Sequence, residues 1–204
     1  MRWIARAAVV AAGVALAAAS SAAWAQQPSR IRGQIEKADG ATLTLKTRDG
    51  GSVSIKLADD ARVAGLNKAT LADIKEDTFI GIAGMPEADG TIKAFSIHIF
   101  LPAQRGVVAD RHGPWDAKAG STMTNAYVGT KVAAKDGETL TVKYKEGEKK
   151  VIVGPDTLIQ AVAPGNKDEL KAGAQIIVMQ AEKQADGSFL AKNIYVGRGL
   201  TPAM

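Results

Sequence analysis

The sequence predicts an all-β protein built from two tandem five-stranded small barrels joined by an ordered connector. Three observations support this prediction: a long internal repeat, an alternation of apolar and polar residues within each copy, and glycine-containing turns between the alternating segments. The predicted divisions are a signal peptide over residues 1–25, a first domain over 26–101, a connector over 102–127 and a second domain over 128–204.

The repeat covers most of the chain after the predicted signal peptide. Ile31–Val63 aligns with Val128–Ile159, so that the segment TLTLK in the first copy matches TLTVK in the second. The match continues downstream, where ADGTIKAFSIHIF aligns with ADGSFLAKNIYVG. Self-similarity of this extent indicates that a unit of about 70 residues has been duplicated.

Within each copy the apolar residues follow the two-residue period of half-buried strands. Leu43 and Leu45 show this period in the first copy, and Leu140 and Val142 show it in the second. Asp-Gly or Glu-Gly pairs separate such segments, and their glycines supply the positive φ that tight hairpins require. Each copy is therefore predicted to form five strands, with a short helical turn (NKATLADI or GNKDEL) between the third and fourth. This is the element order of an OB-fold, a small Greek-key barrel.

The chain resembles exported bacterial proteins that carry a duplicated OB-fold-like domain of unknown function. The resemblance covers essentially all of the predicted mature sequence, and its most specific matches are Ile55–Val63, Ala72–Gly90, His112–Asp116, Ser121–Asn125 and Thr139–Val153. Proteins of that family are often described as related to metal transport. A permease needs spanning helices, and we expect none here after the signal peptide. The resemblance therefore implies a fold and a compartment, but no activity.

The N-terminus is typical of a secretory signal peptide, which we expect to be cleaved after Ala25. Arg2 and Arg6 flank the start, the apolar run AAVVAAGVALAAA follows, and AWA ends at the cleavage position. We therefore expect a periplasmic protein that does not span the membrane once it is cleaved. Removal of the two arginines would lower the formal charge from +5 to +3, which is too small to indicate nucleic acid binding.

The residue content argues against several other function classes. The chain has no cysteine, which excludes disulfides, thiolate zinc sites and cysteine nucleophiles. It also lacks a G-x-S-x-G elbow, an H-E-x-x-H pair and a phosphate-binding glycine loop in a suitable context. We therefore expect no enzymatic activity and no cofactor. Nucleic acid is not an expected partner, because TLTLKT and SVSIKL carry no aromatic residue on which bases would stack.

The two histidines, His98 and His112, suggest an alternative function as a metal-binding accessory protein. Imidazole ligates zinc, copper and nickel, but two histidines supply at most half of a tetrahedral shell. In the segment FSIHIF, we expect Phe95, Ile97 and Ile99 to share one face of a strand. His98 would then point to the other face as a half-exposed residue.

The connector holds the remaining candidate residues and follows neither a helical nor a strand period. Two roles are open for Trp115, the only tryptophan that remains after cleavage. It packs over the barrels with its indole N–H bonded to a carbonyl, or it forms one wall of a ligand cleft with His112 and Asp116. Tyr144 is expected near the concave face of the second barrel. The predicted function is a non-catalytic periplasmic binding or scaffold protein, with an unknown periplasmic protein, peptide or glycan as its partner.

Overall fold

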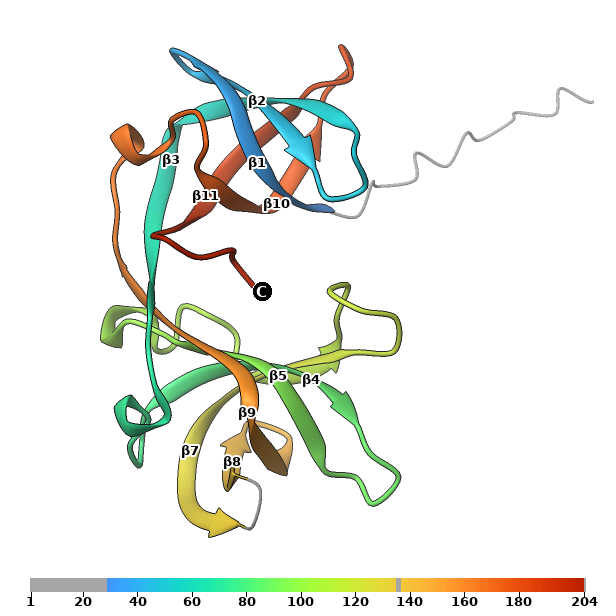
Figure 1. Cartoon of the computed structure of the whole chain (residues 1–204), viewed down its shortest axis with the longest axis vertical. Coiled ribbons are helices and arrows are strands. Elements are labelled where there is room, and N and C mark those ends of the chain that lie inside the picture. Colours follow the sequence, from blue (N-terminus) through green and yellow to red (C-terminus); the bar gives the residue numbers. More distant parts are fainter. Residues whose placement is uncertain (1–28, 135–136, 204) are drawn as a thin grey trace, which may run out of the picture.

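The computed structural model describes residues 29–134 and 137–203, so the predicted signal peptide lies outside the described residues. Strands hold 64% of the described residues and helices 5%, which confirms the all-β class. Figure 1 shows the strands gathered in an upper and a lower group. The strands are β1 (Ser29–Asp39), β2 (Thr42–Thr47), β3 (Ser52–Lys68), β4 (Phe79–Pro86), β5 (Ile92–Ile99), β6 (Arg111–Pro114), β7 (Thr122–Ala134), β8 (Gly137–Tyr144), β9 (Gly147–Pro164), β10 (Gln175–Lys183) and β11 (Phe189–Gly197). Short 3₁₀ turns are η1 (Leu71–Asp73), η2 (Pro102–Gln104) and η3 (Lys167–Glu169).

The upper group is a closed five-stranded barrel in the order β1-β2-β3-β11-β10, called the first barrel below. Four antiparallel pairings and one parallel pairing, between β3 and β11, close it. Leu43, Leu45 and Ile55 point into its interior and are at most 1% exposed. The alternation read from the sequence is therefore the one that fills this core.

The lower group closes in the same way through β7, β8, β9, β5 and β4, and is called the second barrel. Its parallel pairing joins β5 to β9, and its other four pairings are antiparallel. The interior is again built from alternating residues, of which Ile82, Ile97, Leu140, Val142 and Val151 are completely buried.

Each barrel combines three strands from one copy of the predicted repeat with two strands from the other. The hairpin β10–β11 completes the barrel of β1–β3, and the hairpin β4–β5 completes the barrel of β7–β9. This pairing corrects the expected division into domains 26–101 and 128–204, because neither range closes a barrel by itself.

Two long strands cause this exchange. β3 has 17 residues and β9 has 18, and each runs from one barrel to the other. Their C-terminal halves pair antiparallel, from Ala64 opposite Pro164 to Lys68 opposite Gln160, and Figure 1 shows them side by side between the two groups. Because each strand continues instead of turning back, the hairpin that follows it reaches the other barrel. The two hairpins have similar sequences, so the residue pattern does not distinguish exchange from closure within one copy.

The predicted connector is ordered, but much of it is strand. β6 pairs with the start of β7 between Arg111 and Pro114, which extends the sheet of the second barrel. β7 begins at Thr122, inside the range expected to be connector. The strand was missed because polar residues occupy buried positions in it: Thr124 is 0% exposed and Asn125 is 9% exposed. Such residues hide the alternation from which strands are predicted.

Candidate functional site

The structure separates the four predicted ligand-binding residues into two pairs. The rings of His112 and Tyr144 meet with their centroids 6.0 Å apart. Trp115 and Asp116 lie in the loop between β6 and β7 and contact β1 of the first barrel instead. No hydrogen bond, ion pair or ring contact in the described part of the chain links the two pairs, so the structure does not join His112 to Trp115 and Asp116 as the cleft wall predicts.

Trp115 is a packing residue between the barrels. Its side chain is 9% exposed and joins an apolar cluster with Leu66, Val162 and Ile177. The guanidinium of Arg30 lies 3.8 Å from the centroid of the indole ring, a favourable cation–π distance. The indole Nε1 has no hydrogen-bond partner among the described residues, which corrects the expected bond to a carbonyl. The ring is positioned by Arg30 and by apolar neighbours, and neither offers an acceptor.

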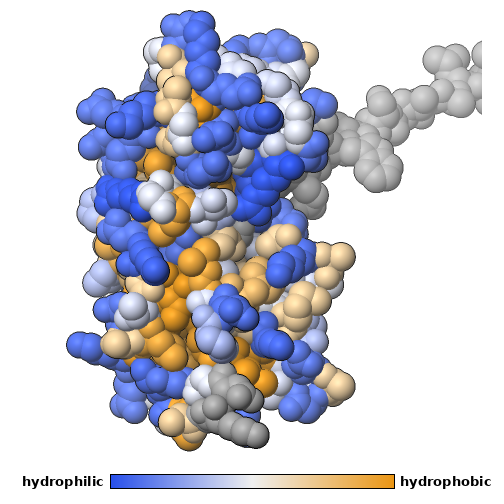
Figure 2. Space-filling model, viewed as in Figure 1, coloured by the Kyte–Doolittle hydropathy of each residue, from blue (hydrophilic) through white to orange (hydrophobic). Residues whose placement is uncertain are grey.

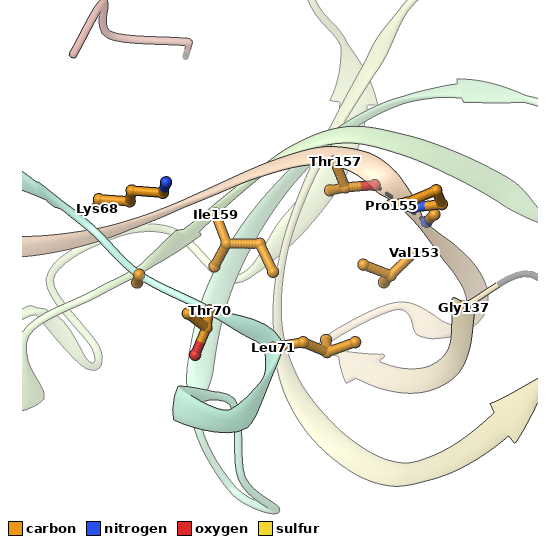
Figure 3. Close-up of a pocket in the computed structure, with 10 residues that line it drawn as sticks. Lys68, Thr70, Leu71, Gly137, Val153, Pro155, Thr157 and Ile159 are labelled. Carbon is orange, nitrogen blue, oxygen red and sulfur yellow. Dashed lines mark hydrogen bonds between the residues drawn. The ribbon is translucent and has the colours of Figure 1, made fainter.

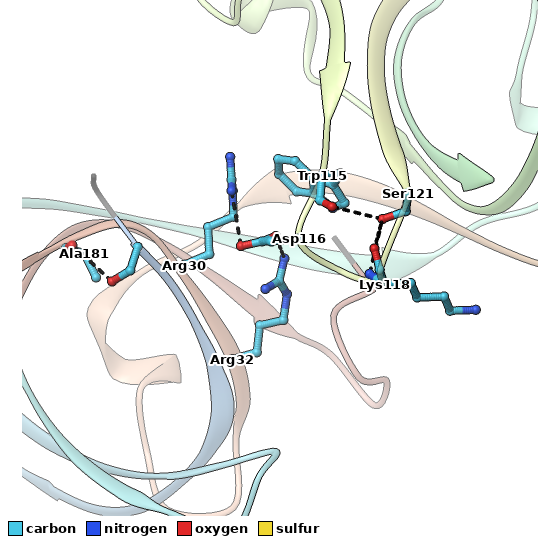
Figure 4. A network of polar contacts seen from close by, with 8 residues as sticks. Arg30, Arg32, Trp115, Asp116, Lys118, Ser121 and Ala181 are labelled. Carbon is cyan, nitrogen blue, oxygen red and sulfur yellow. Dashed lines mark hydrogen bonds and ion pairs between the residues drawn. The ribbon is translucent and has the colours of Figure 1, made fainter. Parts of the chain in front are cut away.

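Asp116 fixes the same loop to the first barrel. Its carboxylate forms ion pairs with Arg30 at 3.2 Å and with Arg32 at 2.7 Å, as Figure 4 shows. Burial by itself would raise the pKa of Asp116, but the hydrogen bonds and charges of Arg32 and Arg30 outweigh it and hold the pKa below its usual value. Within the loop, the backbone N–H of Trp115 donates to the backbone carbonyl of Ser121 at 2.8 Å. Trp115 and Asp116 are thus engaged in holding the chain together.

His98 is completely buried, which corrects the expectation of a half-exposed strand residue. A register shift between Ala94 and Ser96 moves Phe95 off the face of Ile97 and into the cluster between the barrels. His98, on the opposite face of β5, is covered by Gln160 of β9, which is hydrogen-bonded to Thr201 and Ala203 of the C-terminal segment. Alternation alone gives no sign of that cover.

A polar network determines which nitrogen of His98 carries its proton. The side-chain Nε2 of Gln160 donates to the Thr201 carbonyl at 3.1 Å, and its Oε1 accepts from the Ala203 N–H at 3.3 Å. These two bonds fix the orientation of the amide, so that Oε1 is the atom that lies 3.0 Å from His98 Nε2. An amide oxygen only accepts, which places the imidazole proton on Nε2. The network ties β5, β9 and the C-terminal segment together.

We expect His98 to remain neutral far below the usual range for histidine. Burial lowers the pKa of His98 from 6.5 to about 4, against the opposing effect of the hydrogen bond to Gln160. In the unfolded chain the side chain takes up a proton below about pH 6.5. The stability that neutral His98 contributes is therefore complete above pH 6.5 and is lost as the pH falls toward 4. An NMR titration of the imidazole resonances checks this, and a His98 resonance that titrates near 6.5 would contradict it.

The two histidines do not form a common metal site in this arrangement. His98 lies on β5 and His112 on β6, and β4 and β7 stand between these strands in the sheet. Over residues 29–134 and 137–203, no three His, Asp or Glu side chains are grouped so that they could hold a metal ion. The structure therefore does not bring together the ligands that the metal-binding alternative requires.

Two surface grooves lie at corresponding ends of the barrels, and none of the sequence-predicted residues lines them. The larger, of about 480 Å³, is beside η1 and β9, and Figure 3 shows Leu71, Val153 and Ile159 facing into it. Apolar side chains gather over the same lower half of the molecule in Figure 2. The smaller, of about 290 Å³, is lined by the corresponding segments of the first barrel, including Gly40, Leu57 and Leu170. Its lining includes the charged residues Asp59 and Lys167.

A polar cluster at the open end of the second barrel is the remaining candidate site. It consists of His112 on β6, Thr124 on β7, Tyr144 on β8 and Lys149 on β9, and is called the mouth cluster below. Thr124 is two residues before the core residue Ala126 and four before Val128, so its side chain lies on the same face of β7 as theirs. It pairs with His112 in register. Lys149 lies opposite the core residue Val142. Since paired residues share a face of the sheet, these side chains point toward the barrel interior.

The contacts within the mouth cluster are specific. His112 Nδ1 is 2.8 Å from the hydroxyl oxygen of Thr124, which is fully buried. His112, Tyr144 and Lys149 are half-buried. Burial and then the positive charge of Lys149 lower the pKa of His112. Sequence reasoning found His112 and Tyr144 but missed the other two. Thr124 lies in an unrecognised strand, and Lys149 lies in a run of alternating charges that resembles an ordinary solvated edge.

Comparison with protein-family models, with curated proteins and with solved structures finds no match to this chain. In the part of the chain that the structure describes, no helix is long and apolar enough to cross a membrane.

Proposed function

We propose that this chain is a non-catalytic periplasmic binding protein with two OB-fold barrels, and that the mouth cluster is its binding site. The order of strands around each barrel supports the OB assignment. Counted by position in the predicted repeat, the strands of both barrels follow the spatial order first, second, third, fifth, fourth, and a 3₁₀ turn follows the third strand of each copy in the chain. This is the topology of the small Greek-key barrels that use their faces and loops to bind other molecules. The signal-like N-terminus and the resemblance to exported proteins support the compartment.

One observation supports the choice of site above the others. His112, Tyr144 and Lys149 reach the barrel mouth from three different strands, yet among the described residues the Tyr144 hydroxyl, the Lys149 ammonium and His112 Nε2 have no hydrogen-bond or ion-pair partner. Asp116 and His98, in contrast, form ion pairs or hydrogen bonds within the protein. Partly buried polar groups without internal partners are what a binding site offers to a ligand.

A thermal-shift screen of the purified mature protein tests this proposal. The screen covers amino acids, neutral sugars, short peptides and small anions, because a ligand that binds only the folded state raises the melting temperature. At a ligand concentration about a hundredfold above Kd, we expect stabilisation of about 2.7 kcal/mol. His112→Ala should abolish the response, whereas Asp116→Asn, which changes a polar residue away from the mouth cluster, should retain it. A ligand that stabilises both variants equally would place the site elsewhere.

The alternative of a metal-binding accessory protein that uses His98 and His112 remains a prediction. Isothermal titration of the mature protein with zinc, copper and nickel measures it directly. Absence of heat at micromolar metal would remove this alternative, and a saturable signal that His112→Ala abolishes would favour it over the binding function proposed above.

A further inference from the structure

We propose that the mouth cluster recognises an oxyanion, a carboxylate or a phosphate group, held between Lys149 and His112. This inference rests on the proposed function, because it assigns a ligand class to the same site. It adds Lys149 and Thr124 to the residues that the sequence suggested.

The first argument is an uncompensated positive charge. Lys149 lies opposite Val142 on the interior face of β9, and Tyr144, two residues after Val142 on β8, brings its ring to 6.0 Å from that of His112. The Lys149 ammonium disfavours protonation of the imidazole. No carboxylate in the described residues forms an ion pair with either group, although ion pairs are formed elsewhere on both barrels. Glu148 is next to Lys149 along β9 and therefore points to the other face of the sheet, opposite Lys143. An anion at the mouth would supply the missing counter-charge.

The second argument is the direction of the available donors. The Thr124 hydroxyl occupies Nδ1 of His112, which leaves Nε2 as the free nitrogen of the ring. When Thr124 donates to Nδ1, Nε2 carries the proton, and it also does so when the imidazole is cationic. Lys149 and the Tyr144 hydroxyl provide further donors, from β9 and β8. Several N–H and O–H donors with no acidic partner suit the oxygens of an anion better than a cation or an apolar group.

The site therefore predicts a link between anion binding and protonation of His112. An anion between Lys149 and His112 offsets their repulsion and favours the imidazolium, so the pKa of His112 must rise when it binds. The charged groups beside His112 are Lys149 on β9, Arg111 on β6 and Asp110, two residues before His112 in the chain, whose Oδ1 is buried without a hydrogen-bond partner. None of these groups reverses the sign of the effect.

An NMR titration of the two histidine rings tests this inference. The pKa of His112 is measured in sodium chloride, and again with sodium phosphate or sodium glucuronate at the same ionic strength. We expect a saturable rise of this pKa with at least one of the two anions, and His98 is the internal control because it is buried. Lys149→Gln should raise the pKa of His112 without anion and weaken anion binding about tenfold, the effect of losing one charged hydrogen bond. Lys183→Gln, which removes the same charge from β10 of the first barrel, should behave like the unmodified protein.

The outcomes separate the inference from the proposed function. A response to phosphate alone identifies a phosphate site, and a response to glucuronate alone identifies a carboxylate site. If neither anion moves the pKa of His112, or if Lys149→Gln responds as the unmodified protein does, the oxyanion assignment is overturned. In that case, a shift of the His112 resonances with a neutral sugar or peptide would leave the binding function intact with a different ligand class.

Discussion

Replacing Trp115 with alanine is expected to lower the free energy of unfolding by about 3 kcal/mol or more, the usual range for truncating a buried aromatic side chain. The indole ring is 9% exposed and packs among residues of both barrels. Truncation leaves a cavity at this junction and also removes the contact with the Arg30 guanidinium at 3.8 Å. Urea unfolding followed by far-ultraviolet dichroism measures the loss.

Trp115→Phe is the matched control for this experiment. Phenylalanine keeps an apolar ring beside Arg30 and removes the indole N–H, which has no hydrogen-bond partner in the described residues. We therefore expect a smaller loss than for alanine, because phenylalanine leaves a smaller cavity. If cleavage after Ala25 occurs, Trp115 is the only tryptophan, and its emission should be blue-shifted until the strands unfold. An alanine variant with unchanged stability would show that the loop between β6 and β7 does not hold the barrels together.

The sequence was most informative where burial follows a simple alternation. Leu43, Leu45, Leu140 and Val142 lie in the barrel interiors, as their spacing predicted. Alternation failed where something other than solvent covers the second face of a strand. His98 and Thr124 are both polar and fully buried, one against Gln160 of β9 and the other against His112 of β6. These covers come from distant parts of the chain and leave no local signal.

The candidate site was predicted in part for a related reason. His112 and Tyr144 stood out because histidine and aromatic residues are rare in this chain, and the structure places their rings 6.0 Å apart. Lys149 did not stand out, because lysines are frequent and its role depends on its face of β9. Trp115 and Asp116 were suggested by the same rarity, yet their neighbours are Arg30 and Arg32 on β1. Proximity in sequence to His112 therefore did not mean a shared site.

The exchange of hairpins between the two copies is the feature furthest from the sequence prediction, and engineered disulfides test it in a chain that has no natural cysteine. Lys56 on β3 lies in register with Leu190 on β11, and Lys93 on β5 lies in register with Ile152 on β9. Lys93 and Leu190 are matching positions of the repeat. If each copy closed its own barrel, Lys56 would therefore face Lys93. Neighbouring strands are about 4.8 Å apart, a separation that a disulfide spans.

We expect the variant Lys56→Cys/Leu190→Cys to form a disulfide within one chain and Lys56→Cys/Lys93→Cys to keep two reactive thiols. The first disulfide closes a long loop of the unfolded chain, and such cross-links contribute up to about 4 kcal/mol of stability in the chain-entropy description. Thiol quantification, non-reducing electrophoresis and urea unfolding with and without reductant measure both effects. A disulfide in the Lys93 variant instead would mean that each copy closes its own barrel. A cross-linked dimer of the Leu190 variant would mean that the hairpins are exchanged between two chains. A monomeric disulfide in the Leu190 variant alone is the result that the pairing of β3 with β11 requires, because only that pairing brings the two positions together within one chain.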